Sequence, residues 1–261
     1  MNIIENTFKK LKSLNKVAFI PFIVAGHPTL EKTEELILLL EHEGADIIEI
    51  GIPFSDPLAD GPVIESAAQK SILNSTKVNQ VFNSILNLRK KTNIPIVILV
   101  YFNTILASGA SGFIEKCLKA NVNGLIIPDL PYEERDELLS LIKETDISLI
   151  PLVTPTSNNR IEKIVSDCKG FVYCVSSLGV TGIRKDFNKD LSSFLNSVRQ
   201  YTDLPLALGF GISNKATIDE LKTHVDGIIV GSALVNKIEE SNCNLEEIKE
   251  FIKDMVSPLK N

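Results

Sequence analysis

Two carboxylates close to one apolar segment are the first candidates for chemistry. Glu49 interrupts the run Ala45–Gly51, and Asp60 lies in the irregular stretch that follows it. A carboxylate in an apolar strand is costly to bury unless it is paired, solvated or has a chemical task. Asp56 and Asp60, each taken alone, fit turns, because Asp-Pro and Asp-Gly are turn signals. Two carboxylates in one strand–loop unit favour acid–base chemistry, with Glu49 as the stronger candidate.

Two glycine turns have the composition of a phosphate site. Gly209-Phe210-Gly211-Ile212 and Gly231-Ser232 each follow a short apolar run, and Gly179–Gly182 is a third glycine segment. Glycine lets backbone N–H groups approach an anion, and a helix N-terminus favours negative charge. A lone Gly-x-Gly is weak, and two ordinary tight turns are the alternative. A pair of such turns after the last two strands of a barrel indicates phosphate binding more strongly.

Other reaction types have less support. The three histidines are scattered without metal-ligand spacing. No lysine stands at the C-terminal end of an expected strand, which disfavours a Schiff-base aldolase. Cys174 lies inside a strand-like run and is interpreted as a core residue. Tyr101 and Tyr173 lie at or near strand ends, and their expected direction favours the wall of a pocket over the core.

Eight short apolar segments supply the strands that must position these residues. They are apolar on both faces, as parallel strands covered by helices require. On the second segment, alternation puts Glu49 on the barrel side and Ile48 and Ile50 on the helix side. The expected strands are Val17–Val24, Ala45–Gly51, Pro95–Tyr101, Val122–Pro128, Ser148–Val153, Gly170–Val175, Pro205–Gly209 and Asp226–Val230.

Amphipathic helical patterns alternate with the strands. They are expected at Phe8–Leu14, around Leu36–Leu40 with Gly44 as the stop, and at Tyr132–Thr145, Asn158–Cys168, Asn214–Thr223 and Asn244–Met255. Eight such units in about 250 residues, without G-x-G-x-x-G after the first strand, favour a closed barrel over an open doubly wound sheet. We therefore expect an α/β protein, a single (β/α)₈ TIM barrel over residues 1–261 with a short extra N-terminal helix.

The barrel fold determines where the chemistry should lie. Active sites of this fold form at the C-terminal ends of the strands. The carboxylate pair and the glycine turns both lie at or just after the C-terminal ends of expected strands. The two longest connections, Ile52–Pro62 and Ser176–Asn188, belong to the same end, and long loops in a compact domain are usually functional.

The composition limits the partners and the compartment. Lys and Arg number 27 against 33 Asp and Glu, a formal net charge of −6, which argues against nucleic acid or an anionic membrane as the main partner. No apolar run reaches about 18 residues, so no membrane span is expected. The four cysteines form no C-x-x-C pair and are interpreted as reduced thiols. The first residues show no targeting pattern, and we expect a cytoplasmic protein, or a stromal one if a plastid encodes it.

Several motifs resemble the tryptophan synthase alpha family. Pro21–Pro28 resembles the opening strand of that family, and Ile48–Pro62 is similar to its signature almost letter for letter. Ile127–Pro131, Gly179–Gly182 and Gly209–Ile212 are also similar. The likeness runs from the first strand to Gly231-Ser232, and the second motif is too long and idiosyncratic to match by chance.

The resemblance implies a reaction and a set of site residues. The reaction is the retro-aldol cleavage of indole-3-glycerol phosphate to indole and glyceraldehyde 3-phosphate. Glu49 would move the proton at indole C3, and Asp60 would accept a hydrogen bond from the indole N–H. The implied substrate-binding residues, together with those of the glycine turns, are Phe22, Leu99, Tyr101, Tyr173, Thr181, Gly182, Gly211, Ile212, Gly231 and Ser232.

The resemblance also implies a partner. A tryptophan synthase beta subunit would receive the indole in an α₂β₂ complex, with the loops Ile52–Pro62 and around Thr181 closing over substrate and facing it. We expect no cofactor or metal in this chain, and PLP only in the beta partner. Two departures stand out: His27 replaces the usual aspartate, and Asn103-Thr104 replaces the common Asn-Pro. Neither touches the carboxylate pair.

Three alternatives remain at this point. The first is a stand-alone indole-releasing lyase, and the second is a non-catalytic subunit that activates a beta partner. The third is another phosphate-binding barrel, such as a phosphoribosyl isomerase or indole-3-glycerol phosphate synthase. Intact Glu49 and Asp60 argue against a non-catalytic subunit. A synthase should carry strand-end lysines, and the other barrels lack the run Pro53–Pro57.

Overall fold

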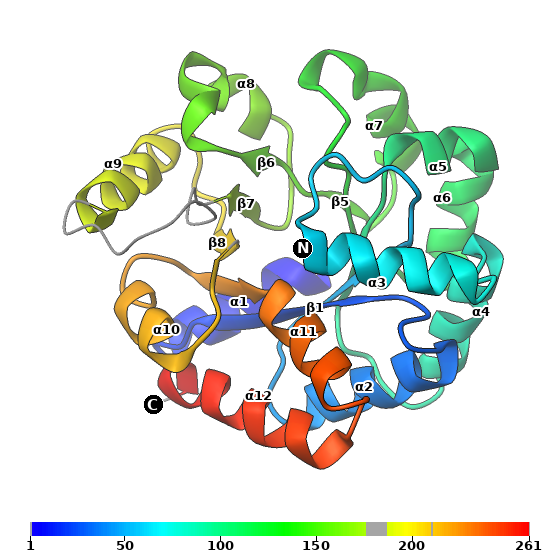
Figure 1. Ribbon diagram of the computed structural model, residues 1–261. Coiled ribbons are helices and arrows are strands. Elements are labelled where there is room, and N and C mark those ends of the chain that lie inside the picture. Colours follow the sequence, from blue (N-terminus) through cyan, green and yellow to red (C-terminus); the bar gives the residue numbers. More distant parts are fainter. Residues whose placement is uncertain (1, 176–186, 210, 261) are drawn as a thin grey trace.

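The strands form one parallel sheet that curls into a barrel. The computed structural model describes residues 2–175, 187–209 and 211–260 (Figure 1). The strand order is β5-β4-β3-β2-β1-β9-β8-β7-β6, and the strands that share a ladder run parallel. The strands are β1 Ala18–Val24, β2 Ile48–Gly51, β3 Ile96–Leu99, β4 Gly124–Ile126, β5 Ser148–Leu149, β6 Leu152–Val153, β7 Val172–Val175, β8 Leu206–Gly209 and β9 Gly227–Val230.

The fifth expected strand is split in two and closes the barrel. Its first half, β5, pairs with β4, and its second half, β6, pairs with β7. Between them the Ile150 N–H donates to the Leu125 carbonyl at 2.8 Å, and the Pro151 carbonyl accepts from the Tyr173 N–H at 2.9 Å. Pro151 has no N–H to donate to a neighbouring strand. At this residue the pairing changes from β4 on one side to β7 on the other. The eight expected strands and the TIM-barrel class are thus confirmed.

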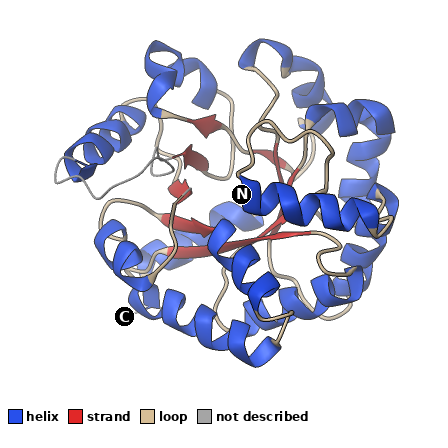
Figure 2. Cartoon of the chain, in the orientation of Figure 1, coloured by secondary structure: helices blue, strands red, loops and turns tan. Residues whose placement is uncertain are grey.

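Helices surround the strands (Figure 2). The expected segments 132–145 and 158–168 are only partly helical. Asn158, with a φ of 40°, breaks the 3₁₀ turn Pro155–Arg160, and the α-helix there begins only at Ile161. The helices are α1 Ile3–Ser13, α2 Leu30–His42, α3 Pro62–Leu73, α4 Val78–Leu88, α5 Phe102–Ser108, α6 Ala110–Lys119, α7 Asp136–Ile142, α8 Ile161–Val165, α9 Phe187–Arg199, α10 Lys215–Leu221, α11 Ser232–Glu240 and α12 Leu245–Lys260, with 3₁₀ turns at Tyr132–Glu134 and Pro155–Arg160.

Alternation along the strands divides the core into two regions. Ile48 and Ile50 belong to the large cluster between sheet and helices, whereas Ile47 belongs to the smaller cluster inside the barrel. The N-terminal helix α1 supplies the buried side chains of Ile4, Phe8 and Leu11 to the inner cluster, where the ring centroids of Phe8 and Phe171 are 5.6 Å apart. The expected extra helix therefore packs against the barrel interior, and α1 lies behind the strands in Figure 1.

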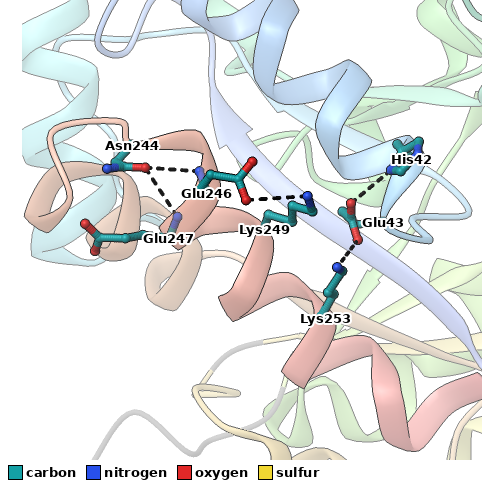
Figure 3. Close-up of polar contacts among 7 residues, drawn as sticks. All are labelled: His42, Glu43, Asn244, Glu246, Glu247, Lys249 and Lys253. Carbon is teal, nitrogen blue, oxygen red and sulfur yellow. Dashed lines mark hydrogen bonds and ion pairs between the residues drawn. The ribbon is translucent and has the colours of Figure 1, made fainter.

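The last helix packs beside α2 on the outer ring. Asn244 precedes α12, and its side-chain oxygen accepts from the N–H groups of Glu246 and Glu247 at 3.1 and 3.4 Å (Figure 3). At the end of α2, Glu43 accepts from His42 at 2.9 Å and lies 3.9 Å from the Lys253 ammonium (Figure 3). The Lys253–Glu43 ion pair joins α12 to the end of α2.

Two helices, α3 and α11, lie across the near end of the barrel in Figure 1. They pack on each other and on β1 through Ala67, Ala68, Val235 and the β1 side chains Phe22 and Val24. Residues 52–61, which lead into α3, contain no helix or strand, as expected of the first long connection. The second expected connection lies mostly outside the described residues, and α9 begins at Phe187.

Candidate active site

A cavity of about 490 Å³ opens at the C-terminal ends of the strands. It is walled by inward-facing strand residues, by the end of the 52–61 connection and by the starts of α3 and α11. Its lining residues are Phe22, Glu49, Ala59, Asp60, Val63, Ile64, Leu99, Pro128, Leu152, Tyr173, Gly211, Ile212, Ser213, Ile229, Gly231, Ser232, Ala233 and Asn236.

Glu49 reaches this cavity from the centre of the sheet. On β2 it pairs with Phe22 of β1 and Val97 of β3, and it is 1% exposed. Among the described residues, no hydrogen-bond partner is found for its Oε2. Burial raises the pKa of Glu49 to about 8, and the negative charge of Asp60 adds to the rise. The carboxyl group therefore holds its proton near neutral pH, as a general acid requires.

Asp60 faces the same cavity from the end of the 52–61 connection. Burial raises its pKa above the usual value, a hydrogen bond with the Tyr101 hydroxyl opposes that rise, and the charge of Glu65 adds to it. Two carboxyl groups that share an apolar site cannot both be charged cheaply. The more deeply buried Glu49 is the one that keeps the proton.

Large apolar side chains line the rest of the cavity, and glycines make room for them. A Cβ at Gly209 would lie 2.4 Å from the Tyr173 hydroxyl, and one at Gly51 would lie 2.7 Å from the Phe22 ring. Real Cβ atoms essentially never come so close, so any larger residue would displace the aromatic wall. Burial also raises the pKa of Tyr173, with the charges of Glu49 and Asp60 adding to the effect. Its hydroxyl therefore stays neutral.

The two glycine turns meet at one side of the cavity. Gly211 and Ile212 come from the connection after β8, and Gly231 and Ser232 from the end of β9. Gly231 is the N-cap of α11, and its N-cap position has no side-chain hydrogen bond. Free backbone N–H groups at a helix N-terminus suit an anion. The turns thus face the same space as the carboxyl pair.

The cavity brings together most of the residues singled out in the sequence. Tyr101 is an exception: it is 2% exposed and does not line the cavity. Alternation along β3 would aim it inward, but β3 ends at Leu99 and Tyr101 is the N-cap of α5. Thr181 and Gly182 lie outside the described residues. Those that line the cavity are Phe22, Glu49, Asp60, Leu99, Tyr173, Gly211, Ile212, Gly231 and Ser232.

Sequence reasoning missed some lining residues. Val63 and Ile64 come from the first turn of α3, and Asn236 lies one turn after Ser232 on α11. Helix α3 is absent from the helices expected above. The Asp-Gly-Pro sequence before it is a helix-start signal that could have found it, because proline favours the first helical position.

The other sequence expectations concern residues away from the cavity. Cys174 is buried in the outer core, as expected. Among the described residues, no group of three His, Cys, Asp or Glu side chains is placed to hold a metal ion. The helices of the described residues also include none with the length and hydrophobicity of a membrane span.

Comparison with known proteins identifies the family. The profile described as "Tryptophan synthase alpha chain" matches residues 8–261. The chain belongs to the tryptophan synthase alpha chain family. It is 46% identical to the tryptophan synthase alpha chain of Alkaliphilus metalliredigens over 97% of this chain and 96% of that protein.

Solved structures agree with this family. A crystal structure of tryptophan synthase subunit alpha from Legionella pneumophila superposes with a TM-score of 0.92 at 32% identity, covering 100% of this chain and 99% of that one. A chain of tryptophan synthase from M. tuberculosis in an aminoacrylate-bound form gives 0.89 at 26% identity, covering 99% of this chain and 100% of that one. The likeness covers the whole barrel.

The buried carboxyl of Glu49 predicts a pH-dependent stability. The unfolded chain releases this proton near the ordinary glutamate pKa of 4.5, whereas the folded one holds it up to about 8. Stability from this group is therefore full below the lower value and lost as pH rises through the upper one, by at most about 1.4 kcal/mol per pH unit. Glu49→Gln should stabilise the fold much more near pH 8 than near pH 5, measured by urea unfolding. Glu115→Gln, exposed on α6, is the matched control; an equal gain at both pH values would contradict the prediction.

Proposed function

We propose that this chain performs the alpha reaction of tryptophan biosynthesis, the cleavage of indole-3-glycerol phosphate into indole and glyceraldehyde 3-phosphate. The observation that carries the proposal is Glu49, a carboxyl group buried in a largely apolar cavity that also holds Asp60 and the paired glycine turns. Burial raises the pKa of Glu49 to about 8. Membership of the family supports the proposal. A candidate acid, a second carboxyl and glycine turns suited to an anion in one cavity match what this substrate requires.

The first step is assigned to Glu49. Its proton goes to C3 of the indole ring, giving an indolenine-like cation in which the bond to the glycerol phosphate carbon is weakened. That bond then breaks and its electron pair returns to the ring, while the neighbouring hydroxyl loses its proton to a base and becomes the carbonyl of the aldehyde. A proton must return to Glu49 before the next turnover. General acid–base steps of this kind give roughly 10²–10⁴-fold each.

Asp60 is assigned a role as an ionised carboxylate, in contrast to the protonated Glu49. An ionised carboxylate that accepts a hydrogen bond from the indole N–H stabilises the positive charge that develops on the ring nitrogen. This interaction is strongest in the transition state and therefore raises the rate. The same negative charge raises the pKa of Glu49. Asp60 thus supports catalysis both at the ring nitrogen and through the acid.

The remaining cavity residues are assigned to binding. Phe22, Leu99 and Tyr173 would hold the indole ring, and the backbone of Gly211, Ile212, Gly231 and Ser232 would hold the phosphate. Thr181 and Gly182 stay predictions from the resemblance. The alpha reaction as proposed uses no cofactor or metal of its own.

A beta subunit is the proposed partner. It would carry PLP, dock at the C-terminal face of the barrel in an α₂β₂ complex and take up the indole. Leu58, in the 52–61 connection at this face, is 89% exposed. The cytoplasmic location stays a prediction. The carboxyl pair favours a catalytic chain over a non-catalytic activator, and family membership disfavours the other phosphate-binding barrels.

Removing the acid should remove the reaction. Glu49→Gln keeps the size of the side chain but has no proton to give, so indole release from indole-3-glycerol phosphate should fall by about 10²-fold or more. The measurement is steady-state indole release, with circular dichroism to show the variant is folded. Retention of more than about a tenth of the wild-type rate would rule out the acid role.

Filling the glycine turn should weaken phosphate binding without harming the fold. The atoms nearest to a Cβ at Gly231 belong to the side chains of Phe22 and Ile64, at ordinary contact distances of 3.5 and 3.7 Å. Gly231→Val should therefore fold, raise the KM for substrate and abolish competitive inhibition by inorganic phosphate. Unchanged inhibition by phosphate would place the anion site elsewhere.

The partner should be coupled to the substrate. A non-cleavable substrate analogue in the alpha site should tighten the binding of a PLP-dependent beta subunit, and by linkage the beta subunit must tighten analogue binding by the same factor. Calorimetry with and without the analogue measures this coupling, alongside indole release at saturating beta subunit. If affinity and turnover are both unchanged, the chain is a stand-alone indole-releasing lyase.

A further inference from the structure

Tyr101 is buried at the start of α5 and does not line the cavity. Its side chain is 2% exposed, and its backbone is the N-cap of α5. The next N–H, that of Phe102, donates to the Asp129 carboxylate at 2.8 Å. Asp129 follows β4, so the start of α5 is tied to the neighbouring barrel unit. The backbone beside Tyr101 is therefore anchored to the neighbouring barrel unit.

The Tyr101 side chain makes three contacts with the connection that carries Asp60. Its ring stacks on Phe54 with centroids 5.0 Å apart and planes 20° apart. Its hydroxyl oxygen accepts from the Ala59 N–H at 3.0 Å. The same hydroxyl lies near the Asp60 carboxyl and, as a hydrogen-bond donor, lowers its pKa. One buried side chain thus contacts the start, the end and the functional carboxyl of a segment without regular structure.

The donor and acceptor roles of the hydroxyl are fixed by these partners. Ala59 offers an N–H, so the oxygen must accept from it. Burial raises the pKa of Tyr101, so the hydroxyl keeps its proton. That proton is left for the Asp60 carboxylate. A bond of this type stabilises the ionised form of the acid and aims its oxygens.

We propose that Tyr101 is a positioning residue that orients Asp60 and keeps it ionised, and that it does not form part of the indole-binding wall. The inference rests on the proposed function, because Asp60 acts there as a carboxylate. It replaces the role implied by resemblance for Tyr101. The substrate would contact Asp60, and Tyr101 would act on the reaction only through it.

Other charged and titratable groups around the pair work against an ionised Asp60. Burial and the charge of Glu65 on α3 both raise the pKa of Asp60. Glu49 on β2 and Tyr173 on β7 interact electrostatically with it, and Asp129 faces Tyr101. Among the described residues around Asp60, Tyr101 is the side chain that lowers its pKa. Its hydroxyl should therefore decide the pH at which Asp60 loses its charge.

The test is Tyr101→Phe, which keeps the ring but removes the hydroxyl. The value of kcat/KM should fall about tenfold, as expected for losing a hydrogen bond to a charged group. Without that donor the pKa of Asp60 rises, so the acid limb of the kcat/KM profile should move to higher pH. The alkaline limb, assigned to Glu49, should stay. An acid limb that does not move would overturn the inference.

Two comparisons separate positioning from simple loss of packing. Phe54→Leu weakens the stacking on Tyr101 but keeps the hydroxyl, so the acid limb should stay at its wild-type pH. In an Asp60→Asn background, Tyr101→Phe should cause little further loss, because the group it acts through is gone. An equal loss of kcat/KM in both backgrounds would show that Tyr101 acts independently of Asp60.

A direct titration of Asp60 tests the inference without depending on catalytic activity. NMR of the protein labelled at aspartate side-chain carbons reports the pKa of Asp60 with and without the Tyr101 hydroxyl. A higher pKa in Tyr101→Phe supports the inference, and an unchanged one overturns it. Failure of the proposed function would show differently, as absence of indole release in the wild-type chain.

Discussion

Burying two carboxyl groups in one apolar cavity is the constraint on which the site depends. Charging both would be costly, because burial disfavours each ionised form and the two negative charges repel. The fold avoids this cost by burying the two carboxyl groups to different depths. Glu49 lies within the sheet, 1% exposed, while Asp60 lies in a connection at the rim with Tyr101 beside it. One acid keeps its proton and the other is helped to lose it, which gives the pair two different roles.

The barrel supplies the apolar surroundings that make this separation possible. Beneath Glu49 the interior is filled by aliphatic side chains and by α1, with Phe8 packed on Phe171. Above it, the missing side chains of Gly51 and Gly209 leave room for the rings of Phe22 and Tyr173. The cavity is thus produced by the alternation of large and absent side chains on neighbouring strands. Its depth is what raises the pKa of the acid.

The rim of the cavity is assembled from segments that are distant in sequence. The 52–61 connection is tied to Tyr101, and its Ser55 carbonyl also accepts from the Gln69 side chain of α3 at 2.9 Å. The start of α11 then places Ser232 in the same cavity as the carboxyl pair. Because α3 and α11 pack on each other, the acid–base half and the anion half of the site are held together as one unit.

The sequence by itself determined the barrel, the inward face of Glu49 and the meeting of the two glycine turns, because strands buried on both faces must be apolar throughout and alternate strictly. It did not predict the split at Pro151, the part of α3 in the cavity or the position of Tyr101. Alternation ends where the strand ends, and Tyr101 lies two residues past Leu99. Beyond that point, side-chain direction depends on contacts with distant loops, such as that with Ala59, and periodicity carries no information about them.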